Sequence, residues 1–142
     1  MTTVGQLLRE KGSYVCCVGP DDTVYDAIRK MADEDIGSLV VIENDKPIGI
    51  ITERHYSRNV ALKGRTSPAT RVRDIMETKI LYARADQSVE ECMVVMTDRR
   101  VRHLPVIDRE KLVGIVSIGD LVKNIIKNQE FLIDQLVHYI HA

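Results

Sequence analysis

The chain has 142 residues, enough for one ordinary domain or for two small halves that share a core. Apolar residues make up 44% of the chain and charged residues 29%, which excludes a disordered tail. A formal charge of −1 argues against broad electrostatic binding to DNA, RNA or anionic lipid. No apolar run approaches the roughly 20 residues of a membrane-spanning helix, and the first residues carry no signal-peptide core. We therefore expect a cytoplasmic protein without a membrane partner.

The first half of the chain alternates between extended and helical patterns. Residues 14–18 form an extended stretch, and Thr23 is a typical N-cap for the helix that follows it. Two apolar runs, 39–42 and 48–51, predict a β-hairpin with a polar turn of about four residues between them. A second helix is predicted to begin at Thr52.

The second half repeats this order of elements. It has an extended stretch at 80–83, a helix after Ser88, a hairpin with a four-residue turn, and a helix from Ser117. A shift of 65 residues aligns residues 20–56 with 85–121 without a gap, and ten of the 37 pairs are identical. About two identities are expected by chance. The chain is therefore a tandem duplication of a strand–helix–strand–strand–helix unit.

One such unit is too small to bury its own apolar faces. We therefore predict an α+β fold in which two units pack sheet to sheet with pseudo-two-fold symmetry and leave a cleft where they meet. The predicted boundaries are 3–62 for the first unit, 63–71 for a linker, 72–127 for the second unit and 128–142 for a C-terminal helix extension.

One short motif closes both hairpins. It is Gly49-Ile-Ile-Thr-Glu-Arg-His in the first copy and Gly114-Ile-Val-Ser-Ile-Gly-Asp in the second. The hydroxyl begins a helix, where unpaired N–H groups and the helix dipole favour an anion. A carboxylate one turn later can accept two hydrogen bonds from a diol, and the glycine permits close approach of a ligand or another backbone segment. The motif suits a ribose phosphate; the alternative is an N-cap followed by a solvated acid.

Together with Gly37-Ser-Leu-Val-Val and Arg102-His-Leu-Pro-Val-Ile-Asp, these motifs resemble a tandem cystathionine-β-synthase (CBS) domain pair, or Bateman module. The resemblance covers about residues 3–126, and residues 51–67 are similar to stand-alone bacterial CBS pairs related to IMP dehydrogenase. It implies a non-enzymatic regulatory homodimer. It also implies an adenosine-containing ligand of the AMP, ATP, NAD(H) or S-adenosylmethionine class in the cleft, with no required cofactor.

The resemblance implies roles for individual residues of the second copy. Ser117 matches a hydroxyl that faces phosphate or ribose, and Asp120 matches the acid that binds ribose. Arg102 and His103 match positions that face phosphate across the cleft. The apolar walls around adenine correspond to Ile80, Leu81, Val101, Leu104 and Pro105.

The first copy departs from this pattern. Thr52 supplies its hydroxyl, but His55 stands where the acid is expected, and a histidine cannot hold a diol at two points as a carboxylate does. Nearby Arg54 and Arg58 could still hold phosphate. The candidate ligand-binding residues of this copy also include Gly37 and Ser38.

Other reactive residues indicate neither a catalytic nor a metal site. The three cysteines lack a disulfide framework and metal spacing, and we expect them to be buried as small apolar residues. No histidine pairs with a cysteine at zinc-ligand spacing, and there is no nucleophile elbow. Arg99 and Arg100 are interpreted as a solvated helix end and not as a nucleic-acid site, because acids follow closely and stacking aromatics are absent.

Residues from Asp120 to the C-terminus carry apolar side chains at helical spacing. Those beyond residue 127 have no counterpart in the first repeat. We expect this extension to form a dimer or partner interface; the alternative is packing on the module itself. The main functional alternative is a dimerisation or interaction module that does not bind nucleotide. A third possibility, an enzyme that uses a nucleotide substrate, lacks a water-activating acid or metal cluster.

Overall fold

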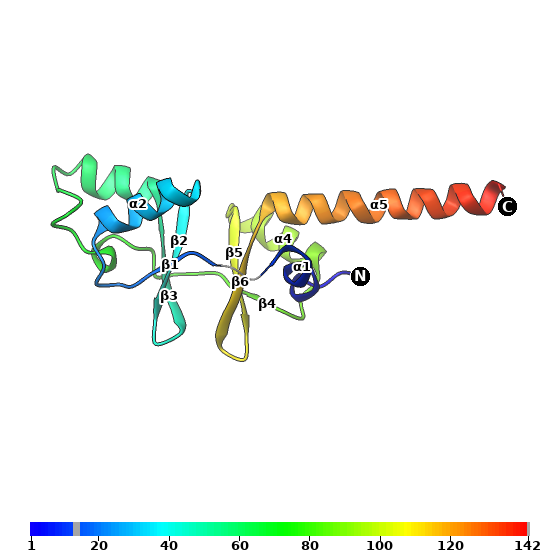
Figure 1. The fold of residues 1–142 in the computed structure, drawn as a ribbon, viewed down its shortest axis with the longest axis horizontal. Helices are drawn as coiled ribbons and strands as arrows, with labels where there is room; N and C mark the ends of the chain where they lie inside the picture. The colour runs from blue at the N-terminus through cyan, green and yellow to red at the C-terminus, as the bar shows by residue number, and fades with distance from the viewer. Residues whose placement is uncertain (13–14, 142) are drawn as a thin grey trace. The chain divides into compact units, whose positions relative to one another are not determined.

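The computed structural model describes residues 1–12 and 15–141, which form two compact units (Figure 1). Unit 1 contains residues 1–13, 82–108 and 113–142, and unit 2 contains residues 14–81 and 109–112. Each unit is described by itself below.

Unit 2 holds the first repeat. Its elements in chain order are β1 (Cys17–Val18), α2 (Val24–Glu34), β2 (Ser38–Glu43), β3 (Lys46–Thr52), α3 (Glu53–Tyr56), the π-helical turn η1 (Ser57–Ala61) and the 3₁₀ turn η2 (Val72–Asp74). The sheet has the order β1-β2-β3, with β1 parallel and β3 antiparallel to β2. Thr23 caps α2 as predicted, because its side chain accepts a hydrogen bond from the Asp26 amide at 3.1 Å.

Unit 1 holds the second repeat, apart from residues 109–112 at the tip of its hairpin, together with the N-terminal helix. Its elements are α1 (Val4–Lys11), β4 (Ala83–Arg84), α4 (Val89–Arg99), β5 (His103–Asp108), β6 (Lys111–Ser117) and α5 (Ile118–His141). The sheet has the order β4-β5-β6, and β4 runs parallel to β5. The predicted strand–helix–strand–strand–helix order is confirmed in both repeats, as is the long C-terminal helix.

The first strand of each repeat is shorter than the sequence predicts. Only Cys17–Val18 of the stretch 14–18 is a strand, and residues 13 and 14 lie outside the described part of the chain. In the second repeat the strand is Ala83–Arg84, so Ile80 to Tyr82 are not part of the sheet. In each repeat, only two residues of the first strand pair with the middle strand of the sheet. A strand of two residues is too short to give an alternating pattern of apolar and polar residues in the sequence.

The hairpin turns are also tighter than predicted. Each has two residues between the strands, not four, and both residues have positive φ: 54° and 63° at Asn44 and Asp45, and 52° and 68° at Arg109 and Glu110. Two left-handed residues match the right-handed twist of the flanking strands. The turns therefore lie within the predicted residues 43–46 and 108–111, but the strands extend to the first and last residue of each. Asn and Asp tolerate the left-handed conformation, whereas Arg and Glu give no sequence signal for it.

The core of unit 2 is aliphatic. One face of α2 and the inner positions of β2 and β3 meet the residues around η2. The buried cluster consists of Val18, Val24, Ala27, Met31, Leu39, Val41, Ile51, Val60, Val72 and Ile75. In unit 1 the equivalent positions of α4 and β5 are also buried. Cys92 is 1% exposed, as predicted for a small apolar residue. Cys16 and Cys17 are half-buried free thiols.

Helix α1 precedes the first repeat in sequence but folds onto the second. The amides of Val4 and Gly5 donate to the carbonyls of Gln87 and Ala85, both at 2.9 Å. Leu8 is 4% exposed and packs against Gly114 so closely that a Cβ at Gly114 would lie 2.7 Å from it.

The segment before the second repeat makes the corresponding contacts in unit 2. The Val72 and Arg73 amides donate to the carbonyls of Asp22 and Pro20 at 2.9 Å, and Met76 fills the space over Gly49. The compact units therefore differ from the predicted boundaries 3–62 and 72–127, because each repeat completes its core with the segment that precedes the other repeat.

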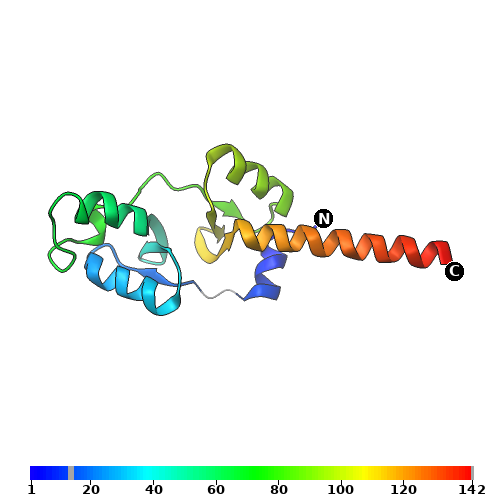
Figure 2. The ribbon, with the colours of Figure 1, turned by 90° about the horizontal axis from the view of Figure 1, so that it is seen from above.

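The predicted linker 63–71 is mostly exposed but joins the unit 2 core at its end. Thr70 is 6% exposed, its carbonyl accepts from the Val24 amide at 2.8 Å, and its hydroxyl donates to the Thr66 carbonyl at 2.8 Å. Helix α5 leaves the rest of unit 1 after about its midpoint, and both views show no other element of unit 1 beside its last turns (Figure 2). Within the described residues, neither α5 nor any other helix combines the length and apolarity needed to cross a bilayer.

Candidate functional site

Ser117 and Asp120 lie together at the start of α5. The Ser117 hydroxyl accepts from the Asp120 amide at 3.1 Å, and Asp120 Oδ2 accepts from the Ser117 amide at 2.9 Å. This reciprocal pair is a capping box in which Ser117 is the N-cap and Asp120 the third residue of the helix, but Asp120 is not the solvated acid of the alternative interpretation. The capping box still leaves the Asp120 carboxylate able to accept hydrogen bonds from a ligand, because 20% of its side chain is exposed. The carboxylate lies at the positive end of the helix dipole.

A third residue, which the sequence analysis missed, joins this pair. The ammonium group of Lys11, in the last turn of α1, lies 2.6 Å from Asp120 Oδ2 and 3.1 Å from the Ile115 carbonyl oxygen. Burial raises the pKa of Asp120, but hydrogen bonds from Lys11 and Ser117 outweigh it, so the pKa lies below its usual value. Lys11 and Asp120 are 109 positions apart, and no sequence spacing connects them.

The first repeat has the same cap with a different residue. Thr52 Oγ1 accepts from the His55 amide at 3.2 Å, and the Thr52 amide donates to His55 Nδ1 at 3.0 Å. That bond requires a neutral imidazole with an unprotonated Nδ1. Burial lowers the pKa of His55; Glu77 opposes this change, and Arg54 and Arg58 add to it.

The residues at the start of each middle strand lie beside these caps. Ser38 pairs with Thr52 in the sheet register, and the Gly37 carbonyl accepts from the Glu53 amide at 3.1 Å. In unit 1 the Arg102 carbonyl accepts from the Ile118 amide at 2.9 Å. In both repeats, therefore, the backbone carbonyl of the candidate residue, Gly37 or Arg102, accepts a hydrogen bond from the first residue of the following helix.

His103 belongs to the Asp120 cluster electrostatically. Burial lowers the pKa of His103; Asp120 opposes the change, and Lys11 and Arg102 reinforce it. In unit 2, Arg54 and Arg58 are exposed and lie close enough to His55 to affect its pKa. Charged groups therefore surround the polar end of both caps.

The residues expected to form apolar walls differ in accessibility. Ile80, Leu81 and Val101 are partly exposed, whereas Leu104 is 1% exposed and Pro105 is also buried. Leu104 is therefore a core residue whose surface is not open to a ligand in this structure. Arg99 ends α4 and Arg100 is its left-handed C-cap, which confirms the interpretation of a helix end.

The glycines of the repeated motif serve packing. A Cβ at Gly49 would lie 2.7 Å from Met76 Sδ, and one at Gly114 would lie 2.7 Å from two methyl carbons of Leu8. The structure therefore assigns the space at each glycine to a core side chain from the crossing segment, not to a ligand.

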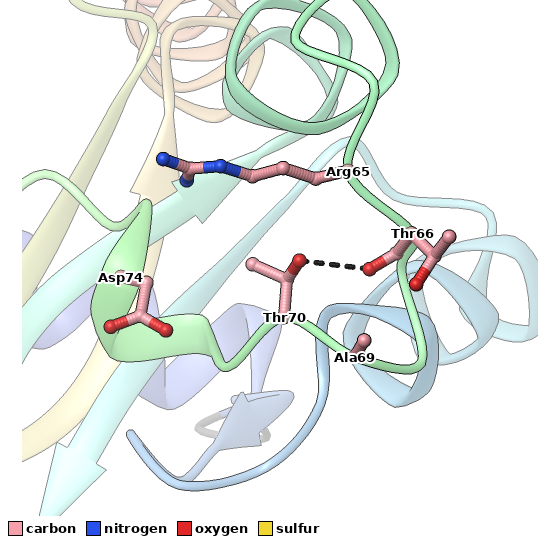
Figure 3. Close-up of a pocket in the computed structure, with 5 residues that line it drawn as sticks. All are labelled: Arg65, Thr66, Ala69, Thr70 and Asp74. Carbon is pink, nitrogen blue, oxygen red and sulfur yellow. Dashed lines mark hydrogen bonds between the residues drawn. The ribbon is translucent and has the colours of Figure 1, made fainter.

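Polar side chains line part of two surface hollows. In unit 1, a hollow of about 410 Å³ lies between α1 and α5 next to the Asp120 cap. It is lined by Leu7, Glu10, Lys11, Asp120, Lys123, Asn124 and Lys127. In unit 2, a hollow of about 480 Å³ is framed by Arg65, Thr66, Ala69, Thr70 and Asp74 (Figure 3). The unit 2 hollow contains none of the predicted site residues.

No cluster of three or more His, Cys, Asp or Glu side chains suitable for a metal ion occurs within residues 1–12 and 15–141. The groups gathered at the caps are hydroxyl, carboxylate, imidazole and ammonium. They can hold polar and charged groups of a ligand by hydrogen bonds.

The fold and these paired caps define a tandem duplication of small α+β units, each with a polar residue one turn into the helix that follows its hairpin. The sequence model of the CBS domain matches residues 12–61 and 72–127. The chain belongs to the CBS domain family.

Three known proteins illustrate the similarity. The mitochondrial CBS domain-containing protein CBSX3 of Arabidopsis thaliana is 39% identical, over 99% of this chain and 73% of its own length. A putative signal-transduction protein with CBS domains from Burkholderia ambifaria MC40-6 has a solved structure with 50% identity and a TM-score of 0.82, covering 90% of this chain and 96% of that one. The inosine-5′-monophosphate dehydrogenase of Methanocaldococcus jannaschii is 38% identical over 77% of this chain, but only 21% of that enzyme's length is covered.

Proposed function

We propose that this chain is a non-enzymatic regulatory module that binds an adenosine-containing ligand at the Ser117–Asp120 cap. The observation that carries the proposal is the position of Asp120: a partly exposed carboxylate, held by the Ser117 amide at 2.9 Å, at the N-terminus of a long helix. A carboxylate fixed in this way can accept hydrogen bonds from a ribose diol without reorganising.

A structural neighbour supports the ligand class. The CBS domain pair of protein MJ0100, solved in complex with 5′-methylthioadenosine and S-adenosyl-L-methionine, has a TM-score of 0.77 to this chain and 20% sequence identity. At that identity the two proteins share a fold, so the ligand class comes to this chain as part of the proposal.

The first-repeat cap is proposed as the weaker site. His55 Nδ1 is already occupied by the Thr52 amide, which leaves one ring nitrogen for a ligand. A ligand that binds one arrangement of the module more tightly than another raises the population of the arrangement it prefers. In this proposal, a partner protein binds that arrangement and is regulated by it. The proposal also includes a cytoplasmic location.

Replacement of Asp120 tests the proposed site. We expect Asp120→Ala to weaken binding of an adenosine ligand by about 1.5–3 kcal/mol, because a charged hydrogen-bond acceptor is lost. Isothermal titration of the wild type against adenosine, AMP, ADP, ATP, NAD⁺ and S-adenosylmethionine identifies the ligand, and the variant is then titrated with it.

Asp134→Ala is the matched control, because Asp134 is an exposed acid on the same helix. Asp120→Asn retains an acceptor for the cap and separates loss of charge from loss of folding. Equal affinities of the wild type and both Asp120 variants would place the ligand elsewhere, and a wild type that binds none of the six compounds would leave the dimerisation module as the better account.

We also propose that the chain is a homodimer joined through α5. Every side chain described from Gln129 to Ile140 is exposed. Leu132, Ile133, Leu136 and Ile140 are each at least 58% exposed. A helical segment of about 12 residues with no packing partner is marginal in water, and an exposed apolar surface of this kind is typical of an interface.

A further inference from the structure

We propose that Lys11 makes the Asp120 site selective for adenosine ligands that carry an anionic group, an inference that rests on the proposed function. Lys11 reaches Asp120 at 2.6 Å, closer than any other cation of unit 1 for which an ion pair is described. The side chains of Lys11 and Asp120 are 40% and 20% exposed, so both groups remain in reach of a ligand.

The ion pair changes what the carboxylate offers. Within the described residues, the hydrogen bonds of the carboxylate from Lys11 and the Ser117 amide both reach Oδ2, which leaves Oδ1 for a ribose hydroxyl. Lys11 also neutralises the charge of Asp120. A cationic ligand therefore gains little attraction from this acid, and an anionic group is not repelled by it. Two of the three ammonium donors of Lys11 go to Asp120 and the Ile115 carbonyl, so one donor remains for an anionic group.

The hollow between α1 and α5 adds to this preference. Three lysines, Lys11, Lys123 and Lys127, and two acids line it. Lys127 lies 3.8 Å from Glu10, and Lys11 is paired with Asp120. Of the three lysines of this lining, Lys123 is the one that takes part in none of the described ion pairs.

Lys123 stands one turn beyond Asp120 on the same face of α5. A phosphate joined to a ribose on Asp120 can reach an ammonium group at either Lys11 or Lys123. The structure thus places a diol acceptor and two cations along one side of α5, an arrangement suited to an adenosine 5′-phosphate and unsuited to the sulfonium of S-adenosylmethionine.

Paired titrations test the selectivity. The full-length chain and its variants are titrated with adenosine, AMP and S-adenosylmethionine at one low salt concentration, and the ratio of the AMP and adenosine affinities is compared. We expect the wild type to bind AMP at least tenfold more tightly than adenosine, because a charge-assisted hydrogen bond is worth about that factor or more. Lys11→Met should lower the ratio to about threefold or less, and Lys11→Arg should largely retain it.

Lys111→Met is the matched control, since Lys111 is an exposed lysine at the other end of β6, about 20 Å from Ser117 along the strand. It should leave the ratio unchanged. Thermal midpoints of all variants show whether each is folded.

The outcomes separate this inference from the proposed function. If the wild type binds adenosine and AMP equally while Asp120→Ala loses both, the site stands and the selectivity is wrong. An unchanged ratio in Lys11→Met, or tighter binding of S-adenosylmethionine than of AMP by the wild type, also overturns the role of Lys11. If the wild type binds none of the compounds, the proposed function and this inference fall together.

Discussion

His55 and Asp120 occupy equivalent positions three residues after a helix-capping hydroxyl, and each accepts a backbone amide through its side chain. Their charge environments are opposite. Asp120 is an anion held by the Lys11 cation, whereas His55 is a neutral base beside Arg54 and Arg58, and Glu77 only partly opposes their effect on its pKa. The two repeats therefore respond differently to pH at the same point of the fold.

Protonation of His55 should destabilise the folded chain. A protonated Nδ1 cannot accept from the Thr52 amide, and burial lowers the pKa of His55 below its unfolded value. The stability from neutral His55 is therefore fully present above the unfolded pKa, about 6.5, and is lost as pH falls through the lower folded pKa.

Urea unfolding between pH 5 and 7.5 checks this prediction. His55→Gln keeps an N3 acceptor but does not titrate, so the wild type should lose about 1 kcal/mol relative to this variant toward pH 5, the size of a lost cap. His103 is present in both chains and cancels in the difference. A difference that does not change with pH would show that the His55 cap does not depend on its protonation state.

At the scale of elements, the main feature is the crossing of α1 onto the second repeat. Its contact has two parts: main-chain hydrogen bonds from Val4 and Gly5 to the segment before α4, and the insertion of Leu8 over Gly114. The same helix delivers Lys11 to Asp120. Packing of α1 is thus a precondition for the geometry of the candidate site.

Leu8→Ala should destabilise unit 1 by about 2–5 kcal/mol, because it leaves a cavity at a side chain that is 4% exposed. Chemical denaturation followed by circular dichroism measures the loss. Leu62→Ala is the control: Leu62 is 80% exposed, so its replacement should cost no more than about 0.5 kcal/mol. A cost below about 1 kcal/mol at Leu8 would contradict a tightly packed α1.

At the scale of the whole molecule, α5 carries a heptad pattern on its exposed side. Ile126, Ile133 and Ile140 recur every seven residues, and the residues four positions before them are Val122, Gln129 and Leu136. Isoleucine occupies all three first positions of the heptads and leucine one of the three fourth positions, a pattern that favours a parallel two-stranded coiled coil.

The wild type should therefore have twice the mass of the 16.1 kDa chain in light scattering. Ile133→Glu should give monomers, because a charge would enter the apolar seam, and the 58% exposure of Ile133 means that the folded monomer tolerates it. Phe131→Glu, on the opposite face of the helix, should remain dimeric. A monomeric wild type, or dissociation by the Phe131 variant alone, would refute this interface.

The sequence by itself determined the duplication, the order of elements and the starts of the helices. These features depend on residues close together in the chain: Thr23 caps through the amide three residues later, and Ser117 and Asp120 close their box over the same distance. Local hydrogen bonds and periodic apolar faces can be predicted from the sequence without knowledge of the fold. The CBS family could also be identified from the sequence.

Only the tertiary structure decided which segment completes the core of each repeat and which side chain pairs with Asp120 at the candidate site. The close approach predicted at the glycines of the repeated motif is made by the Met76 side chain and the Glu77 backbone at Gly49, and by the Leu8 side chain at Gly114. The two-residue turns with left-handed Arg109 and Glu110 follow from strand twist and not from their residue types. The contact of Lys11 with Asp120 joins positions 109 residues apart, because the packing of α1 sets it and no local pattern encodes such packing.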